Sequence, residues 1–154
     1  MIILGVILLV VDIISKYFIS RYLVLGSSII IVKNFINITY VRNTGAAWSI
    51  LSNNTLLVST ISGIIICLIC LYIYRNKPKY KLEKVAYSFI IAGALGNFID
   101  RIVHGYVVDF IDVMIFKYDY PIFNLADVFI VLGVILLVIH TWRCSDSGGK
   151  GKRK

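Results

Sequence analysis

The sequence lacks the motifs of the commonest hydrolase and nucleotide-binding sites. It contains no Gly-x-Ser-x-Gly elbow, no His-Glu-x-x-His pair and no phosphate-binding loop. Serine, zinc and nucleotide chemistries therefore have no support from sequence motifs. The two histidines, His104 and His140, are isolated and lack the spacing of metal ligands, so they are expected to pack at the membrane edges. The sequence pattern predicts no metal site.

Cysteine is too scarce to build a disulfide framework. Of the three cysteines, Cys67 and Cys70 form a Cys-x-x-Cys pair inside an apolar stretch. A redox or zinc role needs polar neighbours, and none are present there. Free cysteine commonly behaves as a small hydrophobic residue, so packing is the expected role.

Acidic residues are also few. There are 8 Asp and Glu against 16 Lys and Arg, which gives a formal charge of +8. Such a charge can indicate a nucleic-acid binder, but the basic residues lie mostly in two clusters beside hydrophobic runs. That placement favours anchorage at an anionic membrane leaflet. No nucleic-acid partner is predicted.

Apolar residues are abundant. The hydrophobic share is 59% and the mean hydropathy is +0.88, well above the roughly 45–50% apolar content of soluble domains. At 154 residues, the chain has room for one compact unit. The composition predicts a single membrane domain over residues 1–154, mainly α-helical.

A bilayer core requires about 20 predominantly apolar residues per helix. Four stretches meet this requirement: residues 2–22, 55–74, 85–104 and 123–142. The first is expected to remain as a transmembrane helix, because it has no basic leader and is interrupted by Asp12 and Lys16. Basic residues follow the second and fourth stretches. The positive-inside rule therefore places both termini in the cytoplasm.

The two remaining connections then lie outside the cytoplasm. In residues 23–54, β-branched and aromatic residues predict short strands within 28–41. A short amphipathic helix is expected at 46–51, where Trp48 would lie in the interface. The second connection, 105–122, is rich in Tyr and Phe and carries three aspartates. The basic tail, 145–154, is expected to be disordered.

Several polar residues interrupt these apolar stretches. Asp12 and Lys16 are four apart, so they share a helix face and are expected to pair and to support a site from behind. Asn43 and Gly45 are typical of a simple turn, but Arg42 and Asn43 could also offer donors at the outer surface to a peptide backbone or a carboxyl. Asn97 and Arg101 share another helix face and suggest a polar network, although arginine at a rim can also snorkel.

Asp109 and Asp127 are the strongest catalytic candidates. An aspartate at a bilayer edge is costly unless a function keeps it there. Two carboxyls that share one proton supply both the base and the acid that peptide hydrolysis requires. Asn124 lies one helical turn before Asp127 and is placed to bond either to the pair or to the substrate. Asp112 is the alternative to Asp109 in the same segment. Asp100 is expected to pair with Arg101 or to stay partly solvated.

These motifs, in this order, resemble the type II signal peptidases of bacteria, which process lipoproteins. The matching elements are Asp12-x-x-Ser15-Lys16, Asn43-Thr44-Gly45-Ala46-Ala47, Gly96-Asn97-Phe98-Ile99-Asp100-Arg101, Val108-Asp109-Phe110 and Phe123-Asn124-Leu125-Ala126-Asp127. Each motif is weak alone, but five in register cover nearly the whole chain.

The resemblance implies four transmembrane helices, a small extracytoplasmic β-sheet cradle and an interfacial helix. It also implies that Asp109 and Asp127 are catalytic. The positions that shape the site or hold substrate would be Asp12, Lys16, Asn43, Gly45, Asn97, Arg101 and Asn124. The implied substrate is a prolipoprotein whose cysteine already carries diacylglycerol, cut on the N-terminal side of that cysteine.

The resemblance further implies a bacterial cytoplasmic membrane protein, inhibited by the cyclic peptide globomycin and working without a metal or organic cofactor. A monomer is expected. Two other functions fit the composition. A proton-coupled transporter would carry polar groups along a path across the bilayer. A non-enzymatic membrane subunit would use them only to hold helices together.

Overall fold

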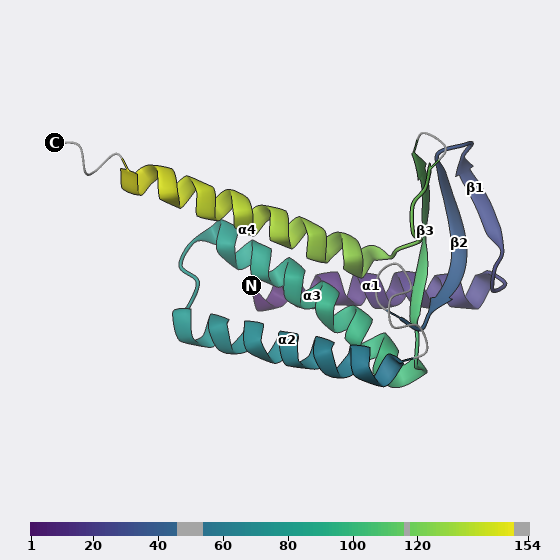
Figure 1. Ribbon diagram of the computed structural model, residues 1–154, viewed down its shortest axis with the longest axis horizontal. Helices are drawn as coiled ribbons and strands as arrows, with labels where there is room; N and C mark the ends of the chain where they lie inside the picture. Colours follow the sequence, from purple (N-terminus) through teal and green to yellow (C-terminus); the bar gives the residue numbers. More distant parts are fainter. Residues whose placement is uncertain (46–53, 116–117, 150–154) are drawn as a thin grey trace.

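The protein is described by a computed structural model over residues 1–45, 54–115 and 118–149. Within these ranges, four helices run alongside one another and a sheet lies across one end of them (Figure 1). All four helices are long and apolar enough to cross a membrane. Their bounds are α1 Ile2–Tyr22, α2 Thr55–Asn76, α3 Lys81–His104 and α4 Leu125–Gly149. The predicted mainly α membrane fold is confirmed.

Three helices extend further than the apolar stretches alone predict; α2 ends at Asn76, two residues after the predicted end. α3 begins at Lys81, four residues before the predicted start, because the charged residues after Pro78 are good helix formers. α4 continues to Gly149, so residues 145–149 are helical where a disordered tail was predicted. No strong helix breaker precedes Gly148, so the helix runs beyond its apolar part. Residues 150–154 lie outside the described ranges.

α3 is the central helix, since it packs against each of the other three. Where lipid replaces water, apolar surface gives helices little reason to associate, and close contact of small residues matters more. Gly93 in α3 lies against the backbone of α4 at Ala126 and Ile130, and Gly133 in α4 lies against α3 at Ile90. Glycine at these two positions therefore lets α3 and α4 approach closely.

α1 reverses the burial pattern of a soluble helix. Along its length, all of which the structure describes, the buried side chains are those of Asp12 and Lys16. Most of its large apolar side chains are exposed, as expected for a helix that faces lipid. The only strongly polar pair in the span is therefore turned towards the other helices.

The sheet is antiparallel, with strand order β1-β2-β3-β4. The strands are β1 Ser28–Val32, β2 Ile36–Asn43, β3 Val107–Ile115 and β4 Tyr118–Asp119. The strands predicted in residues 28–41 correspond to β1 and β2. β3 was not predicted from the pattern, because its aspartates obscured an otherwise apolar run. Its pairing with β2 places Val41 opposite Asp109 and Asn43 opposite Val107.

A small apolar core fixes the sheet to the helices. Tyr40 of β2 and Val108 and Phe110 of β3 are buried together. Ile19 at the end of α1 and Leu125 at the start of α4 pack against them. The sheet is thus held at the helix ends that carry the polar motifs.

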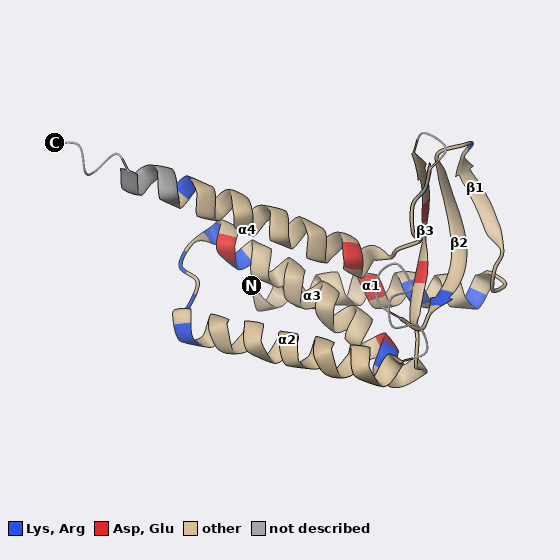
Figure 2. Ribbon diagram, viewed as in Figure 1, with Lys and Arg blue, Asp and Glu red and all other residues tan. Residues whose placement is uncertain are grey.

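Charge differs between the two ends of the molecule (Figure 2). The turn between α2 and α3 and its flanks carry a cluster of basic residues: Arg75, Lys77, Lys79, Lys81 and Lys84. The C-terminal part of α4 lies at this same end, and the sheet lies at the opposite one (Figures 1 and 2). The basic cluster and the sheet would therefore face opposite sides of a membrane.

Candidate active site

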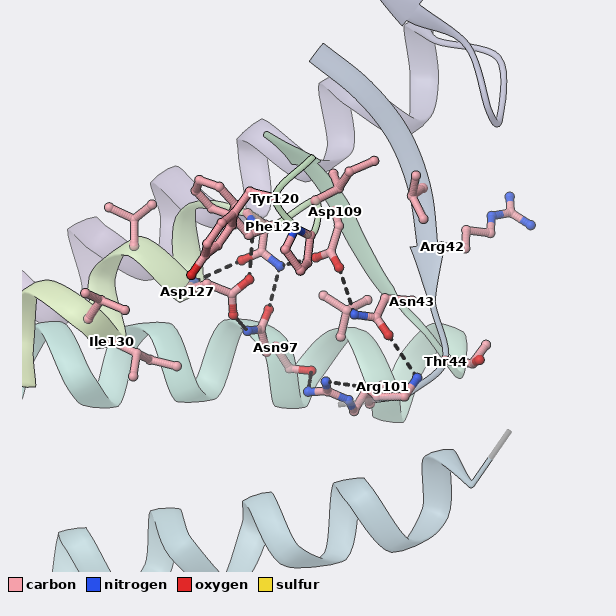
Figure 3. Close-up of a pocket in the computed structure, with 18 of the residues that line it drawn as sticks. Arg42, Asn43, Thr44, Asn97, Arg101, Asp109, Tyr120, Phe123, Asp127 and Ile130 are labelled. Carbon is pink, nitrogen blue, oxygen red and sulfur yellow. Dashed lines mark hydrogen bonds between the residues drawn. The ribbon is translucent and has the colours of Figure 1, made fainter. Parts of the chain in front are cut away.

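A cavity of about 760 Å³ lies where the sheet meets α3 and α4 (Figure 3). β2 and β3 form one side of it, and residues 120–124 lead from the sheet into α4. Asp109 and Asp127 both line this cavity, with Asn43, Asn97 and Arg101. Its remaining lining is largely apolar and continues along α4 through Val128, Val131 and Leu132. The two predicted carboxyls are therefore brought to one place, although 18 residues separate them in sequence.

Asp109 projects from β3 and is buried. Its two carboxylate oxygens accept hydrogen bonds from different asparagines. Asn43 Nδ2 donates to Oδ2 at 2.9 Å, and Asn124 Nδ2 donates to Oδ1 at 2.6 Å. The carboxyl is thus fixed from both sides by neutral donors.

Asp127 lies in the first turn of α4. Its Oδ1 accepts a hydrogen bond from Asn97 Nδ2 at 2.7 Å, and its Oδ2 accepts one from the backbone N–H of Asn124 at 3.1 Å. The backbone N–H of Asp127 in turn donates to Asn124 Oδ1 at 3.1 Å. These reciprocal bonds form a capping box, which satisfies backbone donors that the helix start would leave unpaired.

Asn124 therefore joins the two aspartates. Its side chain caps the helix that carries Asp127 and donates to Asp109, and it is completely buried. A second donation, at 3.1 Å, reaches Asn97 Oδ1. The sequence predicted that Asn124 would bond to the pair, and the geometry places it between the two carboxyls.

The orientation of two amide groups follows from their partners. Lys16 Nζ lies 3.0 Å from Asn97 Oδ1, and an ammonium group can only donate. The carbonyl of Asn97 must therefore face Lys16, which leaves its NH₂ group for Asp127. In the same way, the backbone N–H of Gly45 donates to Asn43 Oδ1 at 2.9 Å and turns the NH₂ group of Asn43 towards Asp109.

Arg101 connects the two asparagine-bearing segments. It donates to the backbone carbonyl of Gly45 at 3.0 Å and to that of Asn97 at 3.3 Å. Within the described residues, its Nε is buried without a hydrogen-bond partner. Arg101 therefore holds the Asn43 segment against α3.

The predicted pair of Asp12 and Lys16 is present, with Nζ at 2.8 Å from Asp12 Oδ2. Asp100 differs from expectation. It is buried, and its Oδ2 lies 3.1 Å from Lys16 Nζ rather than beside the Arg101 guanidinium. Asp100 and Arg101 are adjacent on a helix and so point in directions about 100° apart, which turns Asp100 towards α1. Sequence reasoning missed this contact because Lys16 is 84 residues away.

Asp112, the alternative to Asp109, does not line the cavity. Its Oδ2 accepts hydrogen bonds from Thr39 Oγ1 at 2.6 Å and from Asn37 Nδ2 at 3.3 Å, both on β2. Asp109 and Asp112 are an odd number of residues apart on one strand, so their side chains leave opposite faces of the sheet. Only Asp109 faces the helices.

No metal site accompanies these carboxyls in the part of the chain that the structure describes. There, no three His, Cys, Asp or Glu side chains form a group that could hold an ion. His104 lies 3.9 Å from Asp100, and His140 lies against the Tyr80 ring, well away from each other along α3 and α4. Trp48 and the predicted interfacial helix fall in residues 46–53, outside the described ranges.

Burial raises the pKa of the Asp109 carboxyl from its ordinary value of 3.8 to about 6. The negative charge of Asp127 contributes to this rise, whereas hydrogen bonds from Asn43 and Asn124 and the charge of Lys16 act against it. The carboxyl of Asp109 is thus the one that its surroundings favour for holding a proton. Two carboxyls bridged in this way can transfer protons to and from a water molecule at the cavity.

The raised pKa of Asp109 predicts a pH-dependent stability. Because the folded-state value lies above the unfolded one, its contribution is complete below about pH 4 and declines as the pH rises through about 6. The ionised form then costs about 3 kcal/mol of unfolding free energy. Asp109→Asn removes this charge. The Tm of the variant minus the Tm of wild type, both measured in detergent, should therefore be larger at pH 8 than at pH 4. A difference independent of pH would contradict the prediction.

Comparison with known proteins gives a consistent result. The model of the family described as "Signal peptidase (SPase) II" matches residues 4–143. A lipoprotein signal peptidase of Staphylococcus aureus (strain bovine RF122 / ET3-1) is 46% identical over 139 residues, which cover 90% of this chain and 85% of that protein. One from Staphylococcus haemolyticus (strain JCSC1435) is 44% identical over 146 residues, covering 94% and 92%.

Solved structures agree in fold. One described as a bacterial membrane enzyme, at 2.3 Å resolution, superimposes with a TM-score of 0.88 and 40% identity, covering 99% of this chain and 92% of the other. A second such structure, at 1.9 Å resolution, gives a TM-score of 0.80 and 43% identity, covering 91% and 90%. With most of its length matched by the family model and by close relatives, this four-helix membrane protein belongs to the signal peptidase II family of aspartic endopeptidases.

Proposed function

We propose that this signal peptidase uses Asp109 and Asp127 as its catalytic pair and cuts diacylglyceryl-modified prolipoproteins on the N-terminal side of the lipidated cysteine. One observation carries the assignment. Inside a cavity whose other walls are largely apolar, Asn124 bonds to both carboxyls: its backbone N–H donates to Asp127 in α4 and its side-chain NH₂ group donates to Asp109 in β3. That arrangement supports acid–base chemistry on a substrate that is itself partly lipid.

In the proposed mechanism, Asp109 carries the shared proton and Asp127 is ionised. Asp127 takes a proton from a water molecule while Asp109 donates a hydrogen bond to the carbonyl oxygen of the scissile peptide. The hydroxyl adds to the carbonyl carbon and gives a tetrahedral intermediate. Asp127 then returns its proton to the leaving nitrogen, the C–N bond breaks, and a carboxylic acid and an amine result. No covalent bond to the enzyme forms.

Asn97, Asn43 and Arg101 keep the carboxyls in place during these transfers. Both amide groups are already oriented by Lys16 and Gly45, so little reorganisation is required. Arg101 also lines the cavity, where its positive charge would attract a backbone carbonyl of the substrate. The apolar wall of α4 would receive acyl chains or the apolar part of the signal peptide.

The proposed location follows from the charge distribution. The basic turn between α2 and α3 would lie in the cytoplasm with both termini. The sheet and the catalytic pair would then lie near the outer face of the bacterial cytoplasmic membrane. There, a diacylglyceryl cysteine inserts its chains in the outer leaflet and presents the adjacent peptide bond at the depth of Asp109.

The substrate proposal is tested with purified enzyme and two synthetic peptides that differ only in the diacylglyceryl group on cysteine. The lipidated peptide should be cut once, giving a product that begins at the modified cysteine, as identified by mass spectrometry. A metal chelator should not slow this reaction, and a globomycin-type peptide should inhibit it. Equal cleavage of the unmodified peptide would contradict the proposed requirement for lipid.

A further inference from the structure

Lys16 makes more contacts than a simple partner of Asp12 would. Its Nζ lies 2.8 Å from Asp12 Oδ2, 3.1 Å from Asp100 Oδ2 and 3.0 Å from Asn97 Oδ1. The contact with Asn97 is a hydrogen bond, and the two contacts with Asp12 and Asp100 are ion pairs. Lys16 is buried, as are both carboxylates. One cation thus binds two buried carboxylates that come from different helices.

Each of these carboxylates also accepts a backbone N–H group from a segment that bears a catalytic aspartate. Asp12 Oδ1 accepts from the N–H of Ala126 at 2.9 Å, and Ala126 directly precedes Asp127. Asp100 Oδ2 accepts from the N–H of Val108 at 3.3 Å, and Val108 directly precedes Asp109. Each catalytic segment is thus held by a carboxylate on the side away from the cavity. Lys16 contacts both of these carboxylates.

We propose that Asp100 is a positioning residue for Asp109, as Asp12 is for Asp127, and that Lys16 sets the spacing of the catalytic pair by holding both supporting carboxylates. The inference rests on the proposed assignment of Asp109 and Asp127 as catalytic. It adds Asp100 to the functional residues and gives Lys16 a specific task. Asp100 itself does not line the cavity, so it acts through the backbone of β3.

Stability alone gives a weak reason for such a cluster. Removing three charged groups from water is costly, and well-packed apolar residues in place of a buried ion network are often equally or more stable. The cluster also carries one more negative than positive charge, before counting His104, which lies 3.9 Å from Asp100 at an exposed position. A requirement for accurate carboxyl placement explains why charge is kept there.

Two substitutions of Asp100 separate its contacts. Asp100→Asn keeps a carbonyl oxygen for the N–H of Val108 but removes the negative charge facing Lys16, whereas Asp100→Ala removes both. We expect Asp100→Ala to lower kcat on the order of 10²-fold, since a misplacement of about 1 Å can have that effect. Asp100→Asn should fall between Ala and wild type, and KM should be unchanged in both.

A purely structural role would give a different pattern. Tm and the folded yield in detergent would fall, while kcat per folded molecule would stay at the wild-type value. That result, or a wild-type kcat in Asp100→Ala, would overturn the inference. Asp112→Asn is the matched control, because Asp112 also lies on the sheet with hydrogen-bonded neighbours but faces away from the cavity. Its kcat should equal that of wild type.

The bridging role of Lys16 is tested by a double-mutant cycle in kcat, which keeps the inference testable even if Asp100→Ala folds poorly. Lys16→Met leaves two carboxylates facing each other without a cation, so both catalytic segments should be displaced. In the double variant Lys16→Met/Asp100→Asn the repulsion is absent, and its loss in kcat should be smaller than the product of the two single losses. A loss in kcat equal to the product of the two single losses would show that Lys16 and Asp100 act independently, and would contradict the bridging role.

Asp109→Asn in the same assay separates this inference from the proposed function. Retained cleavage in Asp109→Asn would show that the catalytic assignment is wrong, and the positioning proposal would fail with it. Loss of cleavage in Asp109→Asn together with wild-type kcat in the Asp100 and Lys16 variants would overturn the positioning proposal alone.

Discussion

Asparagine in place of either Asp109 or Asp127 is expected to reduce kcat by about 10²–10⁴-fold, the range associated with loss of a general acid or base. Asparagine has nearly the same shape as aspartate but can neither take nor release the proton that hydrolysis requires. Purified variants should remain folded and should still bind the lipidated substrate. The measurement is single-turnover cleavage of the lipidated peptide, with binding followed separately.

The same experiment includes an internal check. If Asp109 and Asp127 work as one unit, the double variant should be no slower than the slower single variant, because removing either partner already disables the pair. Asp112→Asn should cleave at the wild-type rate. Cleavage above one tenth of wild type in Asp109→Asn or Asp127→Asn would refute the dyad.

Gly93→Ala is expected to impair folding and cleavage together. A Cβ atom at this position would overlap the backbone oxygen of Ala126 and come within 2.8 Å of Ile130 Cγ1 and 3.1 Å of the Ile130 backbone nitrogen. Backbone atoms cannot rotate away, so α3 and α4 would have to separate. Overpacking of this kind typically costs about 1–3 kcal/mol of unfolding free energy. Ala126 precedes Asp127, so the displacement would reach the catalytic pair.

Gly5→Ala is the matched control for this substitution. It makes the same chemical change inside a transmembrane helix, but the nearest atom to its new Cβ would be the Ser88 backbone oxygen at 3.7 Å, an ordinary contact. Tm and cleavage rate of both variants are compared in one detergent. Gly5→Ala should match or slightly exceed wild type in Tm. A Gly93→Ala variant with wild-type Tm and activity would contradict the expected close packing of α3 and α4.

The helices were predictable because the bilayer imposes a simple requirement. A run of about 20 apolar residues has few alternatives to a transmembrane helix. The observed helix bounds differ from the predicted ones at the ends, because α3 and α4 continue into polar sequence that the hydropathy criterion ignores. The pairing of Asp12 with Lys16 was also predictable, because it depends only on helical spacing.

β3 and the position of Asp100 were not predictable from local sequence. A strand that alternates weakly and contains aspartates looks like a connection until its partner strand is known. The choice between Asp109 and Asp112 depends on which face of that strand is covered, and only the resemblance favoured Asp109. The contact of Asp100 with Lys16 depends on how α1 packs against α3. The spacing of polar and apolar residues along the sequence does not indicate that packing.

The family assignment leaves no place for the transporter and subunit alternatives. The buried charged groups, Asp12 and Lys16 included, gather at the end of the helices next to the sheet and do not form a path across the bilayer. The roles of Asp109, Asp127 and their neighbours remain predictions until the variants are measured.

The dual role of Asn124 has a consequence for biosynthesis. Its side chain closes the first turn of α4 and touches Asp109 in the same conformation. A nascent chain whose last helix has not yet inserted therefore has neither the helix start nor the paired carboxyls. With Asp109 and Asp127 as the proposed catalytic pair, we therefore expect cleavage activity only after α4 has inserted.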